Sequence, residues 1–211
     1  MNLQPENIEA KGYAFLSKLS HEEVIPFVQE HLFKRNVFTL GFLFTNMLFL
    51  LWIICQWYLN SVSGLSFGGS FAHFCLGFLF SILLVPIHEY IHGLSYKAVG
   101  ATKIVYTAHW KKFYFTAQAD QFVANYTEFM KVAFAPFLVI SFFCILLIFT
   151  FNDDQALIFI SLLFWHTTMC GWDFALASFF YQYRKSGIIT YDDFGNKETF
   201  FFIKTVKAEN L

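Results

Sequence analysis

Long apolar runs separated by short polar segments dominate the pattern of this chain. Four runs are long enough for a helix to cross a bilayer, which takes about 20 residues, and they occupy residues 37–59, 71–96, 128–151 and 156–182. The first of them contains no charged residue. The pattern predicts an all-α polytopic membrane protein with four transmembrane helices, which together form one domain over residues 37–182.

A polar segment, residues 1–36, precedes the first run. In it, Ser20 and Glu23 have the spacing of a capping box, which predicts a short helix over residues 21–33. One face of this helix carries Val24, Phe27, Val28, His31 and Leu32. An amphipathic helix of this kind is expected to lie along the membrane surface.

Two segments outside the apolar runs are rich in β-branched and aromatic residues, and each predicts a small β-hairpin. The first hairpin is expected at residues 103–118, directly after the second run. The second is expected at residues 187–203, within a polar tail that spans residues 183–211, and its turn should fall within residues 192–197.

Composition agrees with a membrane protein. Hydrophobic residues make up 57% of the chain and charged residues 14%, whereas about 25% of the residues of soluble proteins are charged. The sequence contains no basic patch with interleaved aromatic residues, the pattern that would indicate a nucleic-acid partner. The four cysteines lie inside apolar runs without C-x-x-C spacing, which favours small apolar core residues over a metal site or disulfides.

The distribution of basic residues gives the spans a direction. Nearly all lysines and arginines lie in the N-terminal segment, in the connection between the second and third runs, or in the tail, and the other two connections contain none. The positive-inside rule therefore predicts that both termini and the first hairpin are cytoplasmic.

The second run ends in a cluster of ionisable residues. Residues 81–93 read SILLVPIHEYIHG and include His88, Glu89 and His92. Such groups are costly at membrane depth, so they suggest a functional site. Two histidines four residues apart share a helix face and can hold one zinc ion, with Glu89 beside it as a general base for water. Pro86 should bend the helix just before the motif. In the alternative interpretation, these residues are simply solvated at a helix end.

A catalytic zinc ion usually has three protein ligands, and Asp173 is the leading candidate for the third. Asp173 follows Ala156 by 17 residues, as His88 follows Phe71 by 17. Both spans run in the same direction, so each residue should lie about 26 Å from the outer boundary, at 1.5 Å per residue. An unpaired aspartate inside an apolar span would be costly, and a metal ion removes that cost.

Two other residues are weaker candidates for the same site. His166 precedes Asp173 by two helical turns on the same face, so it is either a partner of a metal ligand or a histidine satisfied within the helix bundle. Glu128 opens the third run, where a solvated residue at a helix terminus is the simpler interpretation.

These motifs carry a resemblance to a known family. The chain contains H-E-Y-I-H-G at residues 88–93, A-P-F at 135–137 and G-W-D at 171–173. It resembles the site-2-protease class of intramembrane zinc metalloproteases, and most closely a bacterial group of zincin peptidases of unknown function, the DUF3267 group. The resemblance covers residues 71–182.

The resemblance implies that His88, His92 and Asp173 bind Zn²⁺ and that Glu89 is the catalytic base, in a multi-pass protein of the bacterial inner membrane. One departure concerns the aspartate. The larger class usually has N-x-x-P-x-P-x-x-D-G around it, whereas here Gly171 precedes the aspartate and the Asn/Pro run is absent.

The leading hypothesis is zinc-assisted peptide hydrolysis within or at the edge of the bilayer, with a membrane protein or peptide as substrate. The hairpin at residues 103–118 would offer an edge strand to an unwound substrate, and Tyr106 and Phe115 are its candidate substrate-binding residues. An ordinary connecting hairpin would show the same pattern. The competing hypothesis is a non-proteolytic membrane protein in which the same residues form a structural metal site or a path for ions or protons.

Overall fold

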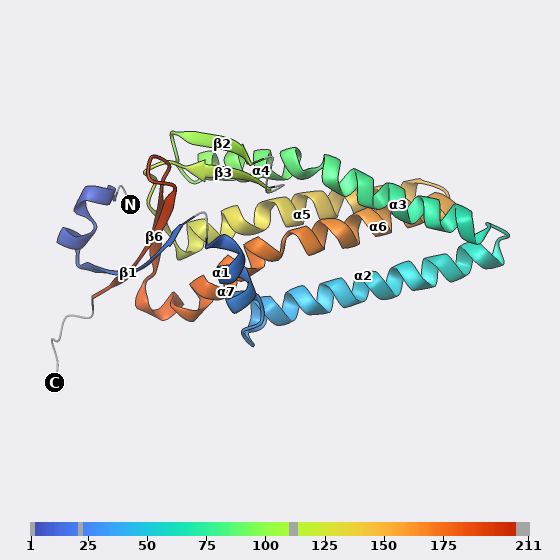
Figure 1. Ribbon diagram of the computed structural model, residues 1–211, viewed down its shortest axis with the longest axis horizontal. Coiled ribbons are helices and arrows are strands. Elements are labelled where there is room, and N and C mark those ends of the chain that lie inside the picture. Colours follow the sequence, from blue (N-terminus) through green and yellow to red (C-terminus); the bar gives the residue numbers. More distant parts are fainter. Residues whose placement is uncertain (1–2, 21–22, 110–113, 206–211) are drawn as a thin grey trace.

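The four apolar runs form two straight helices and two bent helix pairs that lie lengthwise in one bundle (Figure 1). The computed structural model describes residues 3–20, 23–109 and 114–205. The straight helices are α2 (Val37–Val62) and α5 (Tyr126–Thr150), and the bent pairs are α3 (Phe67–Leu83) with α4 (Val85–Ala98) and α6 (Asp153–Met169) with α7 (Gly171–Gln182). By length and composition, two helices can cross a membrane, or up to four segments if each bent pair counts as one span. The chain is therefore mostly helical, as predicted.

Both bends lie close to the candidate site. The α3–α4 pair bends by 42° at Leu84, and Pro86 occupies the first turn of α4, where its missing N–H leaves no hydrogen bond unmade. The bend expected at this proline is confirmed. The α6–α7 pair bends by 45° at Cys170, whose backbone leaves the helical region with a ψ of 2°. This second bend was not predicted, because no proline marks it.

The N-terminal segment differs from its prediction. It contains a strand, β1 (Tyr13–Ser20), followed by helix α1 (Val24–Leu32). The helix is present, but the predicted capping box is wrong. Glu23 is itself the N-cap residue and makes no capping hydrogen bond through its side chain, while Ser20 ends the strand. Residues 21–22 lie outside the described residues.

The face of α1 predicted to be apolar is the face that is buried, and it packs on α7. The Phe27 ring lies 5.4 Å from the Phe179 ring, centroid to centroid. His31 is buried, and its Nδ1 donates a hydrogen bond to the Phe27 carbonyl over 3.0 Å. This amphipathic face therefore covers the helix that carries Asp173.

The two ends of the chain meet in one antiparallel sheet of strand order β1-β6-β5-β4. Its other strands are β4 (Ala124–Asn125), β5 (Ile189–Asp193) and β6 (Glu198–Lys204). The hairpin predicted in the tail is confirmed, but its pairing with β1 was not predicted. Phe201 of β6 packs on Phe179 and Phe180 of α7, so the sheet is attached to the helix bundle through α7.

The first predicted hairpin is also present, as β2 (Ile104–His109) and β3 (Tyr114–Ala119). The register runs from Ile104 opposite Ala119 to His109 opposite Tyr114, and residues 110–113 lie outside the described residues. The two strands fold back alongside α4 (Figure 1). The hairpin therefore covers the helix that carries the histidine motif.

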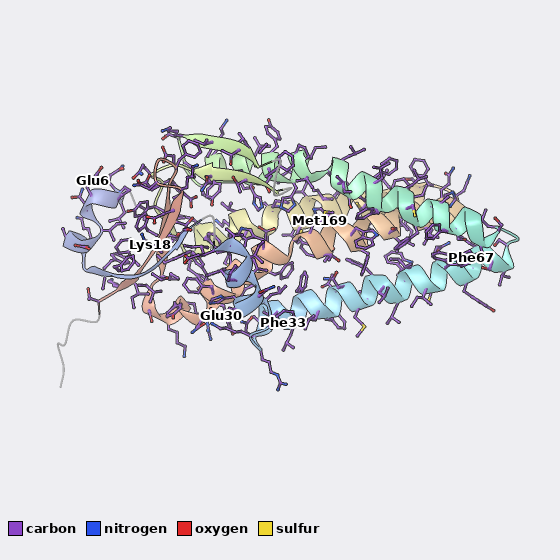
Figure 2. The ribbon with its side chains drawn as sticks, viewed as in Figure 1. Glu6, Lys18, Glu30, Phe33, Phe67 and Met169 are labelled. Atoms are coloured by element: carbon purple, nitrogen blue, oxygen red, sulfur yellow. The ribbon has the colours of Figure 1, made fainter. Side chains whose placement is uncertain are left out.

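Helix α6 lies in the middle of the bundle and packs against α2, α3 and α5. Its residues Leu157, Ile160 and Leu163 are fully buried, whereas α2, α3 and α5 expose many large apolar side chains, including Phe44, Phe67 and Phe149. Figure 2 shows Glu6 and Lys18 at the end of the bundle that carries the sheet and Phe67 at the opposite end.

The interpretation of the cysteines as core residues holds for only two of the four. Cys144 and Cys170 are buried, but Cys55 and Cys75 are exposed on the apolar outer surface. An apolar run alone does not distinguish an inward-facing from an outward-facing position, because in a lipid-facing helix both sides are apolar.

Candidate metal centre

Helix α4 presents two histidines one turn apart. His88 and His92 have the i, i+4 spacing that places side chains on one helix face, and their Nε2 atoms lie 3.0 Å apart. The helix starts at Val85, directly after the bend, so the motif lies in its first turns.

Asp173 approaches this pair from the first turn of α7. Its Oδ2 lies 3.4 Å from Nε2 of His88, and its Oδ1 lies 3.2 Å from Nε2 of His92. The three side chains retain only 12%, 10% and 7% of their exposure, in the order His88, His92, Asp173. The structure therefore brings together the three residues that the sequence analysis selected as ligands.

The other nitrogen of each histidine ring has its own partner. Nδ1 of His92 lies 3.0 Å from the Val132 carbonyl of α5. Because a carbonyl only accepts, this nitrogen must carry the hydrogen. Nδ1 of His88 lies 3.1 Å from Nε2 of His166. If the rings of His88 and His92 are neutral and carry their hydrogen on Nδ1, the Nε2 lone pair of each ring points toward Asp173.

Two imidazole lone pairs and a carboxylate thus converge within a buried space. Without a cation, this arrangement places electron-rich atoms against one another, while a divalent metal ion would be bound by all three. Two nitrogen donors and one carboxylate oxygen are a ligand set of catalytic zinc sites. The residues present therefore fit a zinc ion, and the convergence of their donor atoms is the observation that supports this fit.

His166 lies behind His88 in α6. It is 2% exposed, and Sγ of Cys170 lies 3.8 Å from its Nε2. Its Nδ1 has no hydrogen-bond partner among the residues that the structure describes. Of the two interpretations left open by the sequence, the contact with His88 favours a partner of a metal ligand.

Glu128 lies away from the centre. Its side chain accepts a hydrogen bond of 2.9 Å from the backbone N–H of Asn125, and the Asn125 side chain accepts in turn from the N–H of Glu128. This is a capping box at the start of α5, in agreement with the simpler interpretation of this residue.

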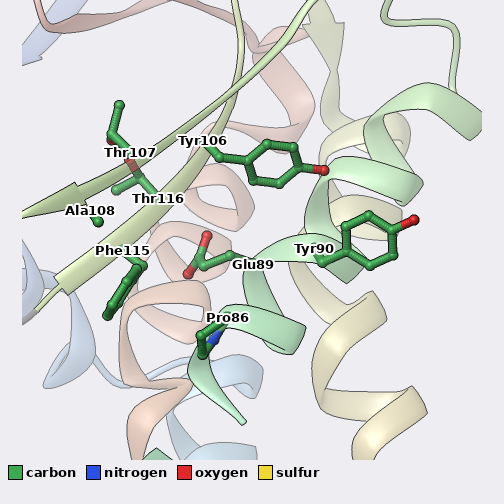
Figure 3. A pocket seen from close by; sticks show the side chains of 8 residues that line it. All are labelled: Pro86, Glu89, Tyr90, Tyr106, Thr107, Ala108, Phe115 and Thr116. Atoms are coloured by element: carbon green, nitrogen blue, oxygen red, sulfur yellow. Dashed lines mark hydrogen bonds between the residues drawn. The ribbon is translucent and has the colours of Figure 1, made fainter. Parts of the chain in front are cut away.

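Glu89 extends from α4 toward the hairpin (Figure 3). Its carboxylate accepts a hydrogen bond from the backbone N–H of Ala117 in β3. Together with Tyr106, Phe115 and other residues of α4 and the hairpin, it lines a pocket of about 310 Å³. The two candidate substrate-binding residues are thus close to the candidate base.

The glycine that follows the motif allows the hairpin to pack closely. A Cβ atom at Gly93 would lie 1.9 Å from the hydroxyl oxygen of Tyr106, so any other residue would displace the Tyr106 side chain or the hairpin that carries it. Partial burial, with Tyr90 and Glu89 nearby, raises the pKa of Tyr106, so its hydroxyl stays protonated near neutral pH. Sequence reasoning did not find this contact or the Ala117 hydrogen bond, because neither has a local signal in the chain.

Aromatic rings pack around Phe174, the residue after Asp173 in α7. Phe174 contacts Phe42, Phe134 and Phe137, with ring centroids 5.2, 5.1 and 5.5 Å away. These contacts hold the first turn of α7 against α2 and α5.

Comparison with known proteins identifies a family for this chain. The family model DUF3267, described as "Putative zincin peptidase", matches residues 81–188, just over half of the chain and the whole of this site. No curated protein matches the chain, and no solved structure matches it.

Proposed function

We propose, from the premise that this chain belongs to the DUF3267 family of zincin peptidases, that it hydrolyses peptide bonds at a zinc centre within or at the edge of a lipid bilayer. The observation that carries the proposal is the convergence of His88, His92 and Asp173 on one point, with Glu89 beside them. A purely structural metal site would not need an additional carboxylate, such as that of Glu89, beside its ligands.

In this proposal, each residue of the centre has a separate task. His88, His92 and Asp173 would hold the metal ion. Zinc held there would supply Lewis acidity, which would acidify a water molecule and polarise the scissile carbonyl. Glu89 takes a proton from that water and passes it to the leaving amine. The N–H of Ala117, which binds the Glu89 carboxylate, orients this base.

A peptide substrate is supported by the geometry of β3. The strand β3 pairs only with β2 in the two-stranded sheet that the structure describes, so its other edge is not paired with a strand. An extended peptide beside β3 would gain main-chain hydrogen bonds, as in other cases of strand addition, and would lie next to the base. A membrane protein or peptide that unwinds locally is therefore the proposed substrate.

The long apolar helices support the proposed location in a membrane. We take each bent pair as one span, which gives four spans and places both termini, and the sheet that joins them, on one side. The positive-inside rule makes that side cytoplasmic, and the family resemblance favours a bacterial inner membrane. The centre then lies in the cytoplasmic halves of the two bent spans, within reach of water from that side.

The test uses the full-length protein in detergent micelles. Wild type should hold about one zinc per chain, and the His88→Ala variant should hold none. Single-span synthetic peptides, analysed by mass spectrometry, should be cleaved by wild type. The Glu89→Gln variant should keep zinc and lose cleavage. Glu30→Gln, the same change at an exposed glutamate of α1, is the matched control and should behave as wild type.

Three results would overturn the proposal. Turnover by zinc-loaded Glu89→Gln at the wild-type rate would remove the assigned base. A full zinc complement without cleavage of any peptide would support the competing function, a structural metal site, and absence of zinc would support an ion or proton path.

A further inference from the structure

The pocket beside Glu89 is built from both α4 and the hairpin (Figure 3). Eight residues line it: Pro86, Glu89, Tyr90, Tyr106, Thr107, Ala108, Phe115 and Thr116. Its volume of about 310 Å³ is at the lower limit of ligand pockets, which hold about 300–1,000 Å³. A space of this size suits one large side chain of a peptide.

The register of the hairpin explains how this pocket is walled. Ala108 lies opposite Phe115, and Tyr106 lies opposite Ala117. In an antiparallel pair, opposed residues point to the same face and next-but-one neighbours share it. Tyr106, Ala108 and Phe115 therefore belong to one face, and the contact of Tyr106 with Gly93 shows that this face is turned to α4.

The lining offers aromatic and aliphatic surface. Pro86, Ala108 and Phe115 are apolar, and the ring of Tyr106 stacks with that of Tyr90, with centroids 6.4 Å apart. Thr107 and Thr116 oppose each other on the other hairpin face, and there their hydroxyl oxygens lie 2.5 Å apart and bond each other. The pocket walls thus provide little that would bind a charged group.

Glu89 is the only charged residue among the eight that line the pocket. An acidic side chain in this space would lose its hydration without gaining a cation, and it would lie beside a second carboxylate. An apolar side chain has no hydrated charge to lose, and its burial in the pocket would remove apolar surface from water. The lining therefore discriminates by polarity as well as by size.

We propose that this space, the Phe115 pocket, receives a large aliphatic or aromatic side chain from the substrate residue next to the scissile bond, and that it restricts the enzyme to peptides with such a residue there. The inference rests on the proposed function, because Glu89 fixes where the bond is cleaved. The pocket lies next to this base, so the residue that fills it must be close to the cleaved bond.

The experiment compares peptides that differ at one residue. A single-span peptide cleaved by wild type is made with Phe, Leu, Ala or Asp beside the cleaved bond, and kcat/KM is measured for each. Wild type should prefer Phe and Leu over Ala by about 10–200-fold, the range that pocket contacts provide, and Asp should be the poorest.

Two variants test the pocket itself. Ala108→Phe should fill it, because Ala108 is exposed to this space. We expect the variant to lose at least tenfold in kcat/KM for the Phe peptide, a larger loss than for the Ala peptide, while its zinc content stays unchanged. Val105→Phe is the matched control, because Val105 lies on the opposite hairpin face and should leave the preference intact.

Binding gives a readout that does not need turnover. Zinc-loaded Glu89→Gln should bind a fluorescently labelled Phe peptide more tightly than the Ala peptide, and this difference should disappear when Ala108→Phe is added. If peptides are cleaved regardless of the varied residue, or if Ala108→Phe lowers all peptides equally, the pocket inference is wrong while the proposed function stands. If binding shows the preference and no peptide is cleaved, the proposed function fails instead.

Discussion

Nδ1 of His88 lies 3.1 Å from Nε2 of His166, so a side chain of α6 fixes the orientation of one candidate zinc ligand on α4. When Nδ1 of His88 donates to His166, the Nε2 of His88 is free to bind metal. The opposite hydrogen placement, with His166 donating, would put the hydrogen of a neutral His88 on Nε2 and block that nitrogen. The acceptor role of His166 is therefore coupled to metal binding.

The first prediction concerns this acceptor. His166→Ala should lower zinc affinity by about 10–100-fold, the usual effect of removing the partner of a ligand histidine. His166→Gln should recover part of the loss, because its amide oxygen can accept the same hydrogen bond. Competition with a chromophoric chelator measures both.

The matched control for His166 is Thr167→Val. Thr167 is fully buried in the same helix, and its side-chain hydroxyl donates to the Leu163 carbonyl. Unchanged zinc affinity in His166→Ala, or an equal loss in Thr167→Val, would show that the His88 contact does not position the ligand.

The second prediction concerns the carboxylate ligand. Asp173→Ala should lose the third donor and leave two imidazoles that hold zinc weakly. A ligand that binds only the folded state raises stability by RT ln(1 + [L]/Kd), so zinc should raise the Tm of wild type but not of Asp173→Ala. Thermal unfolding with zinc and with EDTA measures this difference, and an equal rise in both proteins would exclude Asp173 from the ligand set.

The third prediction concerns the packing of the hairpin on α4. Gly93→Ala would bring a methyl group into the Tyr106 hydroxyl, and overpacking of this kind costs about 1–3 kcal/mol. The hairpin should shift, and with it the hydrogen bond between Ala117 and Glu89, so cleavage should fall while zinc remains bound. Peptide cleavage and thermal unfolding are the measurements.

Tyr106→Ala removes the clashing side chain, so the double variant of Gly93→Ala and Tyr106→Ala should be less impaired than the sum of the two single changes. Such a double-mutant cycle measures their coupling directly. Additive effects would mean that the contact between these residues does not hold the hairpin.

The fourth prediction is a dependence of stability on pH that arises in the sheet. Asp192 of β5 accepts a hydrogen bond of 2.7 Å from the Thr199 hydroxyl. Burial, together with the smaller effect of the neighbouring Asp120, raises the pKa of Asp192 to about 6, although the hydrogen bonds from Thr199 and from the N–H of Ala119 oppose the change. The folded state therefore binds a proton that the unfolded state has released between about pH 4 and pH 6.

Because this pKa is raised, the stability that Asp192 contributes is present below its ordinary pKa of 3.8 and is lost as the pH rises through about 6. Asp120 acts in the opposite direction, since its hydrogen bond from Lys103 lowers its pKa. Asp192→Asn should remove the loss of stability that ionisation of Asp192 causes, and it should stabilise the protein above pH 6 by on the order of 1–3 kcal/mol. Thermal unfolding from pH 5 to pH 8 measures this, and parallel curves for both proteins would contradict it.

Much of the metal centre could be predicted because it depends on short-range spacing and on depth. His88 and His92 follow from one helical turn, and Asp173 follows from two spans that run in the same direction. Pro86 marks the first bend. The second bend, at Cys170, has no equivalent signal, and yet it determines how the first turn of α7 faces the histidines.

The remaining parts depend on contacts between distant segments. Leu19 of β1 pairs with Thr199 of β6, and no local pattern in residues 13–20 indicates such a partner. The Ala117 hydrogen bond and the Gly93–Tyr106 contact likewise require the hairpin to fold back on α4. The sequence predicts that a hairpin exists there but not which of its faces meets the helix.

The pairing of β1 with β6 has a consequence for how the protein is made. The eight residues of β1 are synthesised before the helices of the bundle, and their partner strand β6 is synthesised after them. The sheet that anchors α7 can therefore close only after every helix of the bundle has been made. Because domains generally fold as their segments emerge, the nascent chain would carry its histidine pair long before α7 is fixed, so the candidate metal centre would be completed only after β6 has emerged.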